Sequence, residues 1–67
     1  MDSELKIKYH IYDMFGNFFV TDTRVEALVS FDEGRFVEEV HETTWRTQRG
    51  ISGKNIVIYD WRLNKGG

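Results

Sequence analysis

Hydrophobic and polar residues alternate most clearly near the start of the chain. A period of two runs through residues 5–12, whose apolar members are Leu5, Ile7, Tyr9 and Ile11. This period is typical of a β-strand with one buried face. The segment DMFGN follows, and Gly16 stands where a turn needs a positive φ angle. The pattern predicts a hairpin in which Tyr12 faces Phe18 and Ile11 faces Phe19.

Residues 23–34 fit two different structures. Thr23 and Ser30 are each followed three residues later by glutamate, which is the capping box that begins a helix. The same stretch also alternates in polarity from Val25 to Phe31, as a strand does. Gly34 costs about 1 kcal/mol inside a helix and nothing in a hairpin turn. The glycine therefore favours a strand followed by a turn at 32–34, and the helix stays open.

Two further strands are expected in the last third of the chain. Residues 36–47 are rich in valine, threonine and aromatic residues, which favour a strand, although their three glutamates favour a helix. Residues 56–63 are apolar on both faces at their start, since Ile56 and Ile58 alternate with Val57 and Tyr59. Gly53 and Asn55 are expected to form the tight reversal between the two strands.

These elements predict one mostly β domain over residues 1–67. Five short strands joined by tight turns are enough to form a strongly bent antiparallel small barrel of the Sm-like or SH3-like kind, which leaves few free edges. The alternative fold is ββαβ, with a hairpin, one helix over residues 31–46 and a final strand.

Composition indicates that this domain does not act alone. A chain of 67 residues buries only about 60% of its unfolded surface, and its core therefore needs support. There is no cysteine for a disulfide, and His10 and His41 are the only histidines, too few for a structural zinc site. Five Phe, three Tyr and two Trp exceed what one small core hides. Self-association is expected, with some aromatic residues at an interface.

Charge divides the chain into an acidic part and a basic part. The net charge is −2, but residues 1–42 carry ten acids against four bases and residues 43–67 carry one acid against five bases. The basic segment is suited either to a polyanion or to the acidic part of a neighbouring subunit. We find neither a signal peptide nor a run near the roughly 18 apolar residues of a membrane span, and a cytoplasmic protein without membrane contact is expected.

Three stretches resemble the Sm and LSm proteins, including the bacterial host-factor members. LVSFDEG at 28–34 is similar to the end of the family's first motif, with Leu28, Phe31 and Asp32 matching. ISGKNIVIY at 51–59 is similar to the second motif, with matches at Ile51, Gly53, Asn55, Ile56 and Ile58. The turn at 12–19 places Gly16 at the family's usual glycine. The resemblance implies a five-stranded barrel that forms rings by pairing the fourth strand of one subunit with the fifth of the next.

The resemblance also implies a single-stranded RNA site on the inner rim of the ring. Ser52 and Phe36 stand where the family has its base-binding arginine and asparagine, and nearby basic residues replace the lost charge. The expected RNA-binding residues are Asp32, Arg35, Phe36, Arg49, Lys54 and Asn55. The expected oligomer interface consists of Trp45, Ile56, Ile58, Tyr59 and Trp61.

Catalytic chemistry has no supporting pattern. No nucleophile with a base, carboxylate pair, metal-ligand spacing or phosphate loop is present, so we expect no enzyme, no cofactor and no metal. The primary hypothesis is a homo-oligomeric ring of five to seven subunits that binds single-stranded RNA. The alternative is a small interaction protein of phage or mobile-element origin that masks a host protein. That alternative rests on the acidic part and on the aromatic hairpin of Tyr12, Phe15, Phe18 and Phe19.

Overall fold

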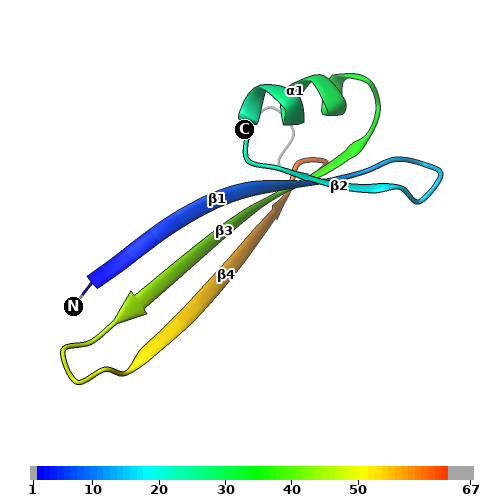
Figure 1. Cartoon of the computed structure of the whole chain (residues 1–67). Helices are drawn as coiled ribbons and strands as arrows, with labels where there is room; N and C mark the ends of the chain where they lie inside the picture. Colours follow the sequence, from blue (N-terminus) through cyan, green and yellow to red (C-terminus); the bar gives the residue numbers. More distant parts are fainter. Residues whose placement is uncertain (1, 64–67) are drawn as a thin grey trace.

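Four antiparallel strands and one helix make up the protein (Figure 1). The computed structural model describes residues 2–63. Along the chain the elements are β1 (Asp2–Tyr12), β2 (Phe18–Thr21), α1 (Arg24–Asp32), β3 (Phe36–Arg46) and β4 (Ser52–Asp60). In space the strand order is β2-β1-β3-β4, so the two longest strands are central. The mostly β class is confirmed.

The first hairpin has the predicted register. Tyr12 lies opposite Phe18 and Ile11 opposite Phe19. The Asp13 N–H donates to the Asn17 carbonyl at 3.1 Å, and Gly16 has a φ of 86°. Because β2 is only four residues long, it pairs with the end of β1 alone and leaves residues 2–8 of β1 without a strand on that side.

The strand favoured at residues 25–31 is wrong, because this stretch is the helix α1. Thr23 is the N-cap residue, so the capping-box sequence at Thr23 and Glu26 marked the true start, although the Thr23 side chain makes no cap hydrogen bond. Gly34 has a φ of 93° and lies just after the helix, where the Gly34 N–H donates to Phe31 and the Arg35 N–H donates to Ser30. These two bonds form a Schellman motif. A glycine with positive φ ends a helix as readily as it closes a hairpin, and this explains the error.

The five-stranded closed barrel is also wrong. One of its expected strands is the helix, and within residues 2–63 the outer strands β2 and β4 pair only with their inner neighbours. The sheet is therefore open. The ββαβ alternative is wrong as well, because residues 36–46 form β3 and the observed order is ββαββ. Side-chain alternation along each strand does not reveal whether a sheet closes on itself.

The second hairpin turns earlier than predicted. The Thr47 N–H donates to the Ile51 carbonyl at 2.7 Å, and Gly50 between them has a φ of 85°. Gly53 and Asn55, the expected reversal, lie inside β4 opposite Trp45 and Thr43. Gly53 serves packing instead, because the Trp45 ring occupies the space above it.

The sheet has two unlike faces. Cross-strand pairs join odd to odd and even to even residues, so odd-numbered strand residues lie on the face that carries α1, the helix face, and even-numbered ones on the open face. The core lies between α1 and the sheet, where the buried residues are Tyr9, Ile11, Ala27 and Val37, with Phe31 and Trp61 packed against them.

The helix covers only one end of its face. Nine helical residues span about 14 Å, whereas the eleven residues of β3 span about 35 Å. Figure 1 shows β3 and β4 running far past α1 to their turn. The radius of gyration is 14.5 Å, compared with about 11 Å for a compact chain of this length. Much of the sheet therefore has no cover.

Candidate interaction surfaces

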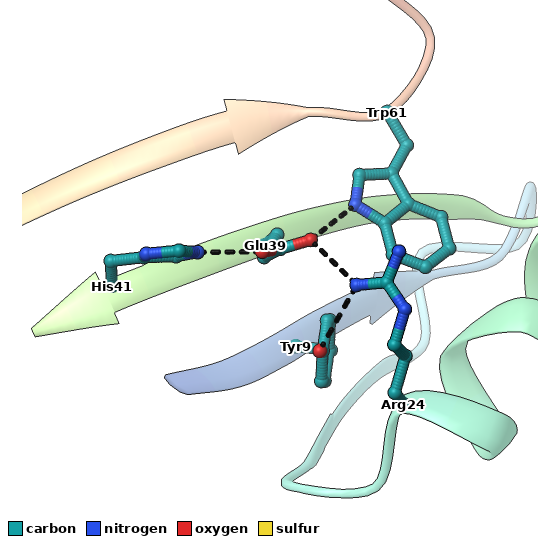
Figure 2. Close-up of polar contacts among 5 residues, drawn as sticks. All are labelled: Tyr9, Arg24, Glu39, His41 and Trp61. Carbon is teal, nitrogen blue, oxygen red and sulfur yellow. Dashed lines mark hydrogen bonds and ion pairs between the residues drawn. The ribbon is translucent and has the colours of Figure 1, made fainter. Parts of the chain in front are cut away.

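A polar cluster centred on Glu39 holds the helix on the sheet (Figure 2). One carboxylate oxygen accepts from Trp61 Nε1 at 3.1 Å and from Arg24 Nη1 at 3.3 Å, and the other oxygen lies 2.6 Å from His41 Nε2. Arg24 also donates to the Tyr9 hydroxyl at 3.5 Å. The cluster thus joins α1, β1, β3 and the residue that follows β4.

The electrostatics of this cluster favour the charged form of Glu39. Partial burial alone would raise the pKa of the carboxyl, but hydrogen bonds from His41 and Trp61 and the charge of Arg24 outweigh that effect and lower it. Because its contacts connect the helix, two strands and residue 61, the cluster stabilises the packing of α1 on the sheet. Among residues 2–63, no group of histidines and acids is placed to hold a metal ion.

The tip of the first hairpin holds two of the most exposed apolar side chains. Met14 and Phe15 are 82% and 85% exposed. The turn beneath them is closed by three hydrogen bonds, because Asp13 Oδ1 accepts from the N–H groups of Phe15 and Asn17, each at 2.8 Å, and Oδ2 accepts from the Asn17 side chain at 2.7 Å. All three hydrogen bonds lower the pKa of Asp13, and the one from the Asn17 side chain has the largest effect. The carboxylate therefore stays charged and keeps the turn closed.

An aromatic group continues from the tip onto the open face. The Phe18 ring lies 5.1 Å from Tyr12 and 5.2 Å from His10, centroid to centroid. The Tyr12 hydroxyl donates to Glu38 at 2.9 Å, and that hydrogen bond raises the pKa of Tyr12. Phe18 remains half exposed. Tip and group together form a ridge of aromatic residues at the helix end of the sheet.

The uncovered half of the helix face is apolar and carries no Asp, Glu, Lys or Arg on its strands. Its exposed members are Leu5, Ile7, Val57 and Tyr59, with His41 beside Tyr59 at 5.0 Å between ring centroids. We call these five residues the distal patch. It continues the core surface beyond the N-terminal end of α1, which lies beside Tyr9, so no element of residues 2–63 covers it.

The predicted RNA-binding residues form two separate groups. Asp32, Arg35 and Phe36 lie where α1 meets β3, whereas Arg49, Lys54 and Asn55 lie at the far turn and the start of β4. The length of β3 separates the groups by roughly 25–30 Å. Arg35 pairs with Glu33, and the Arg62 guanidinium lies 4.6 Å above the Phe36 ring. The structure keeps the two groups apart, and within the second group Lys54 and Asn55 lie on opposite faces of the sheet.

The predicted interface residues also separate. Ile56 and Ile58 lie exposed on the open face of β4, and Tyr59 lies on its helix face. Trp61 packs into the core at 5.5 Å from Phe31 and 5.8 Å from Tyr9, centroid to centroid. Trp45 is half buried over Gly53. Three of the five are thus placed at a surface, and the two tryptophans mainly serve the fold.

Sequence reasoning missed Met14, Leu5 and Ile7 as surface residues. The alternation places Leu5 and Ile7 on the buried face of a strand, which is correct in orientation, but the helix begins beside Tyr9 and runs away from them toward the start of β3. Only the position and length of α1 in the tertiary structure carry that information. The exposure of Met14 was predictable from the sequence, because an apolar residue in a five-residue turn is seldom buried.

Comparison with known proteins gives no relative, so any inference about function rests on the fold and on these surfaces. No family model, no curated protein and no solved structure matches this chain. Within residues 2–63, α1 falls well short of the length and hydrophobicity that crossing a bilayer requires.

Proposed function

We propose that this chain is a non-catalytic interaction protein that anchors Met14 and Phe15 in an apolar pocket of a partner protein. The observation that carries the proposal is the combination of near-complete exposure with a turn closed by hydrogen bonds. Aromatic side chains that enter a pocket supply most of the binding energy in many protein interfaces. This function corresponds to the masking role considered above as the alternative.

The hydrogen-bonded tip lowers the cost of binding. A flexible loop loses conformational freedom when its partner binds, whereas Asp13 and Asn17 already hold this turn in one arrangement. The neighbouring Phe18 and Tyr12 extend the same ridge, and they provide a rim for the anchor. Because residues 1–42 are strongly acidic, the complementary pocket is expected to have a basic rim.

Site-specific photo-cross-linking in cells of the native source tests this proposal. Benzoylphenylalanine placed at position 15 is expected to give one discrete heavier adduct, while the same group at Val25, which is 66% exposed on α1, gives none. Phe15→Ala is expected to weaken binding of the identified partner at least tenfold, and Val25→Ala is the matched control. No adduct at position 15, or equal adducts at both positions, would refute the proposed anchor.

A second candidate function, single-stranded RNA binding, is favoured by the basic end of the sheet. Arg46 and Lys54 line a shallow depression near the second turn, and Arg49 lies in the turn itself. Asp2 and Glu4 line the same depression and balance the charges of Arg46 and Lys54, so the positive charge of this end comes from Arg49 in the turn. Fluorescence anisotropy with short U-rich and A-rich RNA at low and moderate salt tests this candidate. Absence of binding at micromolar protein under both conditions would eliminate it.

A further inference from the structure

The outer edge of β4 has no partner strand among residues 2–63. β4 is nine residues long and, within that range, pairs with β3 alone. At its two ends the Trp61 N–H donates to Val37 and the Ile51 carbonyl accepts from Thr47, so odd-numbered residues direct their backbone groups toward β3. By alternation, the N–H and C=O groups of the even-numbered residues 52–60 point outward. An open edge of this length is a template for pairing with another strand.

β4 carries apolar side chains on both of its faces, as strands at the centre of a sheet do. Ile56 and Ile58 on the open face are 55% and 52% exposed, and Val57 and Tyr59 on the helix face are 47% and 44% exposed. Charged residues stand only near the ends, at Lys54 and Asp60. Apolar residues on both faces are typical of central strands. Because β4 lies at the edge of the sheet, these apolar side chains stay exposed on both faces.

We propose that β4 pairs antiparallel with β4 of a second copy, about a two-fold axis that passes through Val57. This inference is independent of the function proposed for the hairpin tip, because the tip belongs to the β2 edge of the sheet and the pairing uses the β4 edge. It extends the four-stranded sheet to a continuous sheet of eight strands. A two-fold interface of this kind is self-complementary, and a single surface serves both subunits.

The register follows from matching the residues that face each other. With the axis at Val57, Ile56 of one copy lies opposite Ile58 of the other, and Lys54 lies opposite Asp60 at both ends. The outward-facing even residues then form the hydrogen-bonded pairs, as the backbone requires. An axis at Ile58 would place Ile56 opposite Asp60, and an axis at Ile56 would place Ile58 opposite Lys54. Only the axis at Val57 pairs apolar with apolar and opposite charges with each other.

The existing ion pairs are compatible with this register. Lys54 lies 3.9 Å from Glu42, a loose contact, and Asp60 is held by Arg62 at 2.9 Å. Lys54 is half exposed, and Asp60, held by Arg62, lies at the other end of the same strand, so the proposed axis brings these opposite charges to the same two places. Because the axis is perpendicular to the sheet, both helices lie on the same side, and the two distal patches become neighbours.

A single engineered cysteine tests the axis directly, because the chain has no cysteine of its own. Val57→Cys places two sulfurs in a non-hydrogen-bonded pair with about 4.5–5.5 Å between β-carbons, near the distance that a disulfide needs. Mild oxidation is expected to convert most of this variant to a covalent dimer. Ile58→Cys, one residue along the same exposed strand, is the matched control and is expected to stay monomeric on denaturing gels. Equal cross-linking of both variants, or none for Val57→Cys, would overturn the register.

Native mass spectrometry and charge exchange provide the second test. The unmodified protein is expected at the mass of two subunits, and a single subunit or a ring of five to seven would overturn the proposal. Lys54→Asp is expected to weaken dimerisation about tenfold by placing like charges opposite each other at both ends, and the exchange Lys54→Asp with Asp60→Lys is expected to restore it. Phe15→Ala leaves the dimer intact, which separates this test from that of the partner-binding tip.

Discussion

Trp45 lies across the backbone of Gly53, its direct partner on β4, so closely that a β-carbon on Gly53 would overlap the indole ring. The contact explains how a glycine is tolerated within a strand, where it normally weakens pairing. An aromatic ring over a cross-strand glycine restores the lost packing. The pair therefore stabilises the far end of a sheet that the helix does not reach.

Replacing Gly53 by alanine is expected to lower the free energy of unfolding by about 1–3 kcal/mol, since the ring must move to accept the methyl group. Urea denaturation measures the change, and Ser52→Ala on the same strand is the control. In the background of Trp45→Ala the cost of Gly53→Ala should largely disappear. An equal cost in both backgrounds would mean that the ring contact is unimportant.

Replacing Glu39 by glutamine is expected to lower stability at pH 7 by about 1–3 kcal/mol, because Arg24 and His41 lose a charged acceptor. The pKa of Glu39 is lowered in the folded state, so its contribution is complete above the ordinary value of 4.5 and disappears as the pH falls through the folded pKa. Urea denaturation at a series of pH values is therefore expected to show a shallower acid loss for Glu39→Gln than for the unmodified protein. Identical acid profiles would contradict this role of Glu39.

Trp61→Phe removes the indole N–H while it keeps an aromatic ring against Phe31 and Tyr9. Since the hydrogen bond from Trp61 helps to lower the pKa of Glu39, its loss is expected to raise that pKa toward the ordinary value. Titration of the Glu39 carboxyl by NMR measures the shift. Asp13, whose pKa is set by the first hairpin, is the internal control and should not move.

Gly34→Ala is expected to destabilise the protein by about 1–2 kcal/mol, because residue 34 has a φ of 93° and a side chain there is strained. Space is not the cause, since nothing lies within 4 Å of the added carbon. Thermal unfolding followed by circular dichroism measures the loss, with Glu33→Ala beside it as the control. A gain in stability would mean that the Schellman turn after α1 is not the observed one.

The candidate surfaces could be predicted from the sequence in part. The sequence shows apolar residues on both faces of residues 56–59 and aromatic residues at the first hairpin, because both are patterns of neighbouring residues. The proposed RNA site was assembled from residues at 32–36 and 49–55, which are near each other only if the sheet bends into a barrel. In an open sheet, β3 holds them apart.

The amino-acid sequence alone determined the local elements whose physical signals were unambiguous. Alternation from Leu5 to Ile11 and the glycine at position 16 predicted the first hairpin with its register. The mixed composition of residues 36–47 favoured a strand over a helix, and the structure forms β3 at residues 36–46. At residues 24–32 the helical capping signal and the strand alternation had comparable strength, and packing of Ala27 and Phe31 against β1 and β3 decided for the helix. Tertiary structure alone decided that the sheet stays open and that α1 leaves Leu5 and Ile7 uncovered, because strand closure and coverage depend on distances between elements that no local pattern encodes.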